Sequence, residues 1–230
     1  MTASRWKSTL GAMAAAGLML LGSSGAIGGA SEGQELVDRA RYTVEKIMVH
    51  KDLAHHVKDL LPNARGVMIV PDMLKGGIGI GGEGGSGVLL ARRNDGGWGY
   101  PAFFRLGAAS VGVQFGFSES EIIFLIMTED GLQSVLKHNV KLGGEVNFAA
   151  GPEGVNVGAS TTTGYGEDII SYAVSRGLFA GMSLEGGILN DRQDLNAQYY
   201  GDTATPKAIV LEGAYSNPGA DQLRATLARY

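Results

Sequence analysis

The sequence GGIGIGGEGGSGVLLARR, residues 76–93, decides which kind of fold this chain can adopt. Eight of its first twelve residues are glycine, and Gly77, Gly79 and Gly82 match the G-x-G-x-x-G form of a dinucleotide-binding loop. Such a loop must also open a helix, yet GVLLARR meets the turn sequence NDGG after seven residues. Its apolar second half also argues against a solvated linker. The stretch therefore predicts glycine-rich β-sheet, in which glycine marks bulges, bends or close backbone approach.

The composition indicates one globular domain. Of 230 residues, 44% are hydrophobic, 18% are charged, 37 are glycine and only 6 are proline. A chain of this size can bury one sizeable core, and high glycine without high proline is not typical of disorder. The net charge of −4 argues against nucleic acid as a partner. We expect residues 31–230 to form a single domain.

The first 30 residues differ from the rest and predict a secretory signal peptide. Arg5 and Lys7 precede an apolar run, residues 9–22, and small residues follow with candidate cleavage sites at Ala26 and Ala30. The alternative, an uncleaved anchor, is disfavoured because the apolar run is short for a membrane span of about 20 residues. The chain has no cysteine, which excludes disulfides and a lipoprotein anchor. We expect an exported protein of the periplasm or cell envelope.

Helical patterns lie at both ends of the chain and strand patterns lie between them. Residues 34–61 predict one bent helix or two helices, residues 128–138 a middle helix capped by Thr128, and residues 218–229 a terminal helix. Residues 190–201 read as a loop or short helix. The fold class expected is α+β, with a glycine-rich, largely antiparallel β-barrel or sandwich flanked by N-terminal, middle and C-terminal helices. The predicted strands are residues 66–70, 78–81, 86–92, 98–105, 110–117, 122–127, 144–150, 155–160, 169–175 and 178–184.

No arrangement of residues in the sequence predicts catalysis, a metal site or a cofactor. His50, His55 and His56 are separated by five residues and by one residue, and neither spacing places a pair on one helix face. The segment DRQD lacks the oxygen ligands and the central glycine of a calcium loop. No G-x-S-x-G elbow occurs, since Val88 stands where its second glycine should be. We therefore expect a protein that is not an enzyme.

Basic residues beside glycine-rich turns predict an anion site. Guanidinium groups and exposed backbone N–H groups suit phosphate geometry, although strand-end charges are an equally simple interpretation. The candidate head-group residues are Lys75, Arg92, Arg93, Arg105 and Arg176, with Gly82, Gly84 and Gly85 as phosphate-facing glycines. The alternative membrane contact is the apolar helix stripe of Leu36, Val44, Ile47 and Met48, which packing on the sheet would also explain.

Five segments in this order resemble the SYLF-domain family: GIGIGGEGGSGVLLAR, WGYPAFFRLGAASVGVQFG, GPEGVNVGAS, SYAVSRGLFAGMSLEGGIL and NAQYYG. The resemblance covers roughly residues 35–215. It implies a lipid-binding module, associated in the family with phosphoinositides and, in some eukaryotic members, with actin bundling beside an SH3 domain. Because a signal peptide is present and an SH3 segment is not, we expect an anionic phospholipid or membrane surface as partner and no actin. The alternative is a structural or protein-interaction module of the cell envelope without a lipid site.

Overall fold

The computed structural model describes residues 31–144, 146–150, 167–177, 184 and 186–230, so the expected signal peptide lies outside the described residues. No described helix is long and apolar enough to cross a membrane. The helices and strands occur in the following order: α1 (Glu32–Met48), α2 (Ala54–Leu60), the 3-10 helix η1 (Leu61–Asn63), β1 (Gly66–Ala91), β2 (Ala102–Ile126), α3 (Glu129–Val135), β3 (Val140–Lys141), β4 (Phe148–Ala150), β5 (Ile169–Gly177), β6 (Ile188–Asp191), α4 (Gln193–Tyr200), α5 (Pro206–Val210), the 3-10 helix η2 (Pro218–Ala220) and α6 (Asp221–Leu227).

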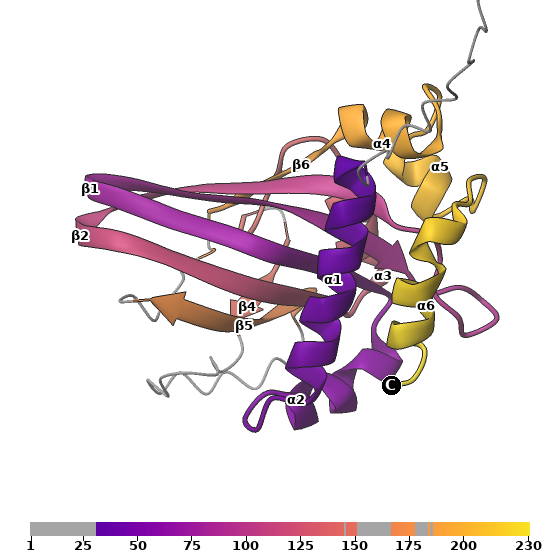
Figure 1. Cartoon of the computed structure of the whole chain (residues 1–230), viewed down its shortest axis with the longest axis horizontal. Coiled ribbons are helices and arrows are strands. Elements are labelled where there is room, and N and C mark those ends of the chain that lie inside the picture. The colour runs from indigo at the N-terminus through magenta and orange to yellow at the C-terminus, as the bar shows by residue number, and fades with distance from the viewer. Residues whose placement is uncertain (1–30, 145, 151–166, 178–183, 185) are drawn as a thin grey trace, which may run out of the picture.

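A long antiparallel hairpin, β1 with β2, forms the frame of the sheet (Figure 1). Its register runs from Gly66 opposite Ile126 to Leu89 opposite Ala102, and β5 and β6 pair with different parts of β2. The sheet order is β3-β6-β2-β5-β4, with β1 paired to β2 and with β4 parallel to β5. The α+β expectation is confirmed, and the sheet is mixed and strongly curled.

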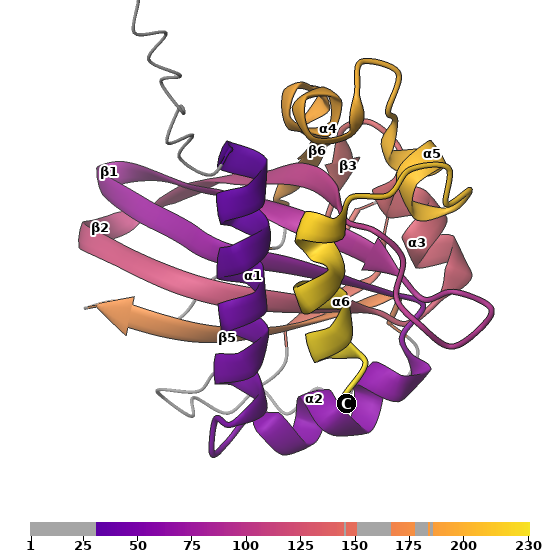
Figure 2. The ribbon, with the colours of Figure 1, turned by 45° about the vertical axis from the view of Figure 1, so that its right-hand side comes forward.

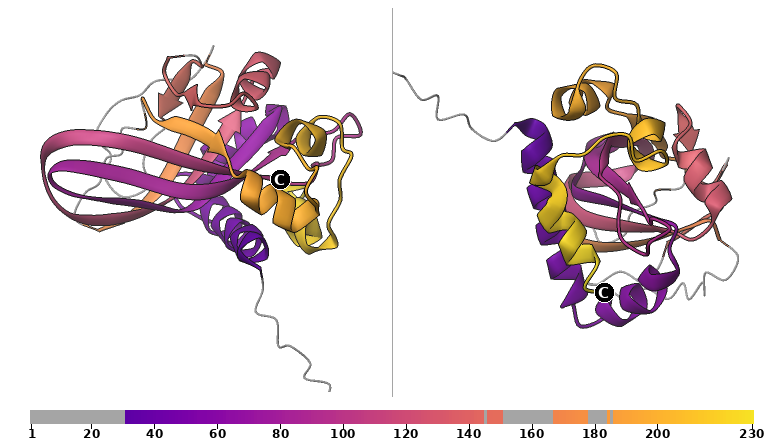
Figure 3. Two further views of the ribbon diagram at one scale, coloured as in Figure 1. Left: turned by 90° about the horizontal axis from the view of Figure 1, so that it is seen from above. Right: turned by 90° about the vertical axis from the view of Figure 1, so that its right-hand side faces the viewer.

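The hairpin folds back on itself, as the view from above shows (Figure 3). We call residues 66–75 the first arm of β1 and residues 82–91 its second arm. A Cβ added at Gly87 would lie 2.5 Å from the carbonyl oxygen of Ile69, which places the backbone of the second arm directly on the first. The prediction that glycine lets strands bend and pack closely is therefore confirmed at this position.

Three short predicted strands, residues 66–70, 78–81 and 86–92, are wrong as separate elements because they join into β1. The predicted strands at residues 98–105, 110–117 and 122–127 likewise correspond to the single strand β2, which begins at Ala102. We interpreted the glycines as the ends of strands, but a glycine in an extended conformation continues the strand. The irregularities of the β1–β2 pairing are register shifts near Val70 and Ile78. The predicted strand at residues 155–160 and residues 178–183 of the last predicted strand lie outside the described residues.

Two apolar layers lie on opposite faces of the sheet. The outer layer, with Val67, Ile123 and Leu125, is covered by α1, α2 and α6 (Figure 2). The inner layer, with Met68 and Phe124, lies inside the folded hairpin and is closed by α3 and α5. Because neighbouring residues of a strand point to opposite faces, the uninterrupted buried apolar run of residues 122–126 shows a strand buried on both sides.

Side-chain caps fix where the helices begin. Ser31 accepts a hydrogen bond from the Gln34 N–H at the start of α1, and Thr128 accepts one from the Gly131 N–H at the start of α3. The predicted helical region of residues 34–61 is two helices, α1 and α2, and the segment at residues 190–201 contains α4. The Thr128 cap is confirmed, since an N-cap hydroxyl satisfies an N–H that has no partner within the helix.

Candidate functional site

Arg92, predicted to bind a phosphate, donates its guanidinium hydrogen bonds to the protein backbone. Its Nε and two terminal nitrogens bond the carbonyl oxygens of Ala64, Leu61 and Gly96 at 3.1, 2.7 and 3.0 Å. The same guanidinium group stacks over an indole, with its carbon 4.2 Å from the centre of the Trp98 ring. Burial lowers the pKa of Arg92. The side chain therefore fastens the end of η1 to the turn after β1.

Lys75 lies inside the folded hairpin and not on a basic surface. It is 8% exposed and stands opposite Ser118 in the β1–β2 register. Glu83, on the second arm, is 6% exposed, and burial raises its pKa while the charge of Lys75 opposes that rise. Ser120 and Ser175 are also buried and share a hydrogen bond of 2.9 Å. We call these five residues the interior polar cluster.

Of the predicted basic residues whose side chains the structure describes, Arg93 and Arg105 reach the surface. Arg93 forms a loose pair with Asp95, in which Nε and Oδ2 are 3.4 Å apart. Arg105 is exposed on β2, where its neighbours in the register are Ser86 and Asn190. Arg176 pairs with Glu119 through the β5–β2 backbone, and its side chain lies outside the described residues. The structure therefore separates Lys75 and Arg92 from the exposed Arg93 and Arg105.

The three glycines predicted to face a phosphate lie within the second arm of β1, so their placement in turns is wrong. A Cβ added at Gly85 would lie 2.5 Å from the Asp72 carbonyl oxygen, whereas Gly82 and Gly84 have ordinary contacts at 3.9 and 3.6 Å. Backbone N–H groups within a strand bond to neighbouring strands instead of opening toward a ligand. Gly85 therefore acts as a packing position between the two arms.

The apolar stripe of α1 belongs to the core. Val44, Ile47 and Met48 are at most 1% exposed, and Leu36 is 8% exposed. All four pack in the outer layer against the sheet and α6. The stripe therefore packs on the sheet in this structure. Contact of the stripe with a membrane would require α1 to separate from the sheet.

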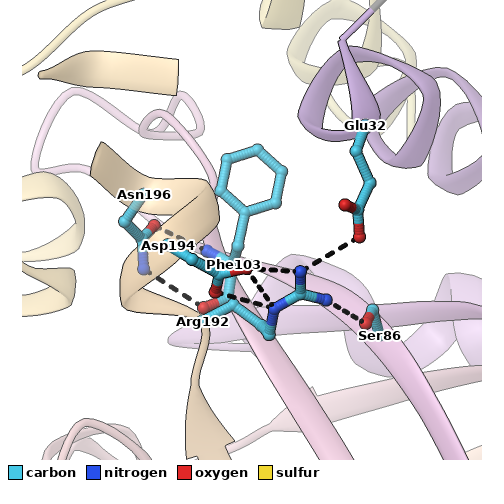
Figure 4. A network of polar contacts seen from close by, with 6 residues as sticks. All are labelled: Glu32, Ser86, Phe103, Arg192, Asp194 and Asn196. Atoms are coloured by element: carbon cyan, nitrogen blue, oxygen red, sulfur yellow. Dashed lines mark hydrogen bonds and ion pairs between the residues drawn. The ribbon is translucent and has the colours of Figure 1, made fainter. Parts of the chain in front are cut away.

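A polar network around Arg192, which the sequence reading missed, joins three distant segments (Figure 4). Arg192 donates to Glu32 in α1, to Ser86 in β1 and to Asp194 in α4, with distances of 3.0, 3.0 and 2.6 Å. The hydrogen bond from Arg192 lowers the pKa of Asp194 to about 2. Asn196 adds two hydrogen bonds to the backbone of Phe103. No local signal could reveal this, because Glu32 is 160 residues and Ser86 106 residues from Arg192.

Fold and contacts together define a class of protein: an α+β scaffold in which long-range polar contacts fasten helices to a curled sheet. Comparison with known sequences then gives the family, described as Las17-binding protein actin regulator, which matches residues 107–230. The chain belongs to this family, and the SYLF resemblance is confirmed.

Relatives in yeast and mammals share much of this chain. LAS seventeen-binding protein 3 of Saccharomyces cerevisiae is 34% identical over 168 residues, which cover 72% of this chain and 36% of the relative. Protein YSC84 of the same yeast is 35% identical over 167 residues, covering 71% and 36%. SH3 domain-containing YSC84-like protein 1 of Bos taurus is 32% identical over 142 residues, covering 61% and 41%. The chain thus spans well under half the length of these relatives.

These names correct the partner expectation. We expected an anionic lipid surface and no actin, whereas the family description names Las17 binding and actin regulation. The exclusion of actin was wrong because it rested on the N-terminal pattern and on the lack of an SH3 segment. Neither feature tests what the shared domain itself binds.

Proposed function

We propose that this protein is a non-catalytic binding module whose partner is a protein of the actin-regulatory system named by its family. The observation that carries this proposal is the 34% identity over 168 residues with a relative named for binding Las17. The identity extends over 72% of this chain. It supports a shared binding surface more directly than it supports a shared enzyme activity.

One exposed face has the residue types of a protein contact. Tyr42 on α1 is 59% exposed and stacks against the Arg41 guanidinium, whose carbon is 4.1 Å from the ring centre. Leu74 on β1 is 60% exposed, two residues beyond Asp72, which accepts a 2.9 Å hydrogen bond from Arg39 of α1. Tyrosine and arginine are enriched among the residues that carry binding energy in protein interfaces. We assign the partner contact to this α1–β1 face.

Co-sedimentation with actin filaments, with and without the Las17 protein, tests the proposal. Residues 31–230 should sediment with filaments or bind Las17, and the double change Tyr42→Ala with Leu74→Ser should weaken that binding at least ten-fold. Ile188→Ser on β6 is the matched control, because Ile188 is exposed at 44% on another element. Absence of binding to both proteins would refute the proposal, and equal loss in the control would refute the assigned face.

A second candidate is contact with an anionic phospholipid surface, supported by the exposed Arg93 and Arg105. Each basic residue near such a surface contributes about 1 kcal/mol and is screened by salt. Flotation with anionic vesicles should therefore weaken with salt and with the pair Arg93→Gln and Arg105→Gln.

Export is proposed from the pattern of residues 1–30. Sequencing of the mature N-terminus tests it, with cleavage expected after Ala26 or Ala30.

A further inference from the structure

The outer face of the sheet continues beyond the helices that cover it. Val88 and Phe103 stand opposite each other and belong to the buried outer layer. Along the same face, toward the tip of the hairpin, come Arg105 and then the pair of Gly84 with Gly107, where both strands run past α1 (Figure 1). A Cβ added at either glycine would meet only strand carbonyl oxygens, at 3.6 and 4.0 Å. Among the described residues, no side chain therefore covers this glycine floor.

Strands β6 and β3 extend the same face. Gly107 stands opposite Ile188 of β6, and Ile188 stands opposite Lys141 of β3. Residues directly opposite one another in a sheet share a face. Ile188 is 44% exposed, and Arg105 and Lys141 are exposed as well. We call these residues the exposed glycine face: Gly84, Arg105, Gly107, Lys141 and Ile188.

The charges of this face favour an anionic partner. Within the described part of the chain, the side chains of Arg105 and Lys141 form no ion pair and no hydrogen bond. The acidic residues at the border of the face, Glu32 and Asp194, are both bound by Arg192, at 3.0 and 2.6 Å. Two cations therefore remain available on a protein whose net charge is −4. Complementary charge of this kind selects the partner and guides its approach.

The spacing of the two cations favours a peptide over a small anion. Arg105 and Lys141 are two strands and two residues apart, which places their Cα atoms roughly 12 Å from each other. An extended peptide with acidic side chains four residues apart spans about 13 Å, and its middle side chain points the same way. That middle side chain meets Ile188 and the glycine floor. If it is apolar it removes Ile188 from water, which a free anion does not do.

We propose that the exposed glycine face binds an extended acidic segment of a protein partner, with the pattern acid-x-leucine-x-acid. The two carboxylates pair with Arg105 and Lys141, and the leucine packs on the glycine floor beside Ile188. This face shares no residue with the α1–β1 face. The proposal does not depend on the actin-related function, and either can fail without the other.

Fluorescence anisotropy of a labelled peptide, Ser-Glu-Thr-Leu-Thr-Glu-Ser, titrated with the whole chain tests the site. Replacing both glutamates by glutamine, or the leucine by serine, should weaken binding about ten-fold, the effect of about 1.4 kcal/mol. A peptide with the glutamates directly beside the leucine should bind as weakly, because its acids then point away from the sheet. Binding of the acidic peptide should also fall as salt rises.

Variants separate this face from the rest of the surface. Arg105→Gln with Lys141→Gln should weaken peptide binding about ten-fold, the effect of about 1.4 kcal/mol. Arg93→Gln with Lys207→Gln is the matched control, because it removes the same charge from exposed positions elsewhere and should leave binding unchanged. Gly107→Val fills the floor while its Cβ keeps a distance of 4.0 Å from the nearest atom. It should therefore keep the native circular dichroism and lose the peptide.

Three results would overturn the proposal. The folded wild type could bind the neutral peptide as tightly as the acidic one, or peptide binding could survive in the folded double variant of Arg105 and Lys141. In the third result, the acidic peptide fails to bind while anionic vesicles bind through these same two residues. The face would then be a membrane contact and not a peptide site.

Discussion

At the scale of single residues, Gly87 determines how closely the two arms of β1 approach. An added Cβ at Gly87 would lie 2.5 Å from the Ile69 carbonyl oxygen and 2.8 Å from Val70 Cγ2. Backbone cannot move aside cheaply, so Gly87→Ala should lower the free energy of unfolding by about 1–3 kcal/mol. Gly84→Ala is the control, because its nearest contact is 3.6 Å. Urea denaturation measures both, and equal losses would show that strand glycine itself, and not the close approach, matters.

Glu83 should make stability depend on pH in an unusual direction for a carboxyl group. Burial raises its pKa in the folded state, so the folded protein holds this proton more tightly than the unfolded chain does. The favourable contribution is complete below the unfolded pKa of about 4.3 and is lost as pH rises through the folded value. Relative to Glu83→Gln, the wild type should therefore lose stability as the pH rises above the unfolded pKa of this carboxyl group. Denaturation at several pH values checks this, and an opposite slope would contradict it.

At the scale of elements, Arg192 connects α1, β1 and α4. Its guanidinium donates to three different groups in a fork geometry that lysine cannot reproduce. Arg192→Lys keeps the charge but should lower the free energy of unfolding by about 1.5–3 kcal/mol, the range for hydrogen bonds to charged groups. Arg93→Lys is the control, since its pair with Asp95 is exposed and worth about 0–1 kcal/mol. Similar losses of unfolding free energy in the two variants would show that the hydrogen bonds of Arg192 do not connect these elements.

The elements also show where a sequence is informative. Residue spacing and caps predicted the helix stripe of α1 and the Thr128 cap, because each depends on neighbours within a few residues. From the sequence we divided β1 and β2 into short strands, because the sequence does not distinguish a glycine within an extended strand from a glycine in a turn. The roles of Arg92 and Arg192 were missed for another reason. Their distant partners include Ala64, 28 residues from Arg92, and Glu32, 160 residues from Arg192, and only the folded chain brings them together.

At the scale of the whole molecule, the sheet carries a core on each face, and α1 closes the outer one. Leu36, Val37, Val44, Ile47 and Met48 are all buried there. Each large side chain contributes about 1.5–3 kcal/mol on burial. Lifting α1 away would therefore cost about as much as the 5–15 kcal/mol that typically stabilises a domain. A partner that binds the folded protein must accordingly use the surface that α1 presents, including Tyr42, and not the stripe beneath it.

Hydrogen exchange tests this arrangement on the intact fold. Amides of α1 should exchange about as slowly as those of residues 122–126 in β2, because both open only when the core opens. Anionic vesicles should leave this protection unchanged, since contact through Arg93 and Arg105 needs no release of α1. Deletion of α1 is a poorer experiment, because it removes core side chains and should unfold the chain. If vesicles accelerate exchange in α1 while β2 stays protected, the helix does leave the sheet, and the membrane contact belongs to Leu36, Val44, Ile47 and Met48.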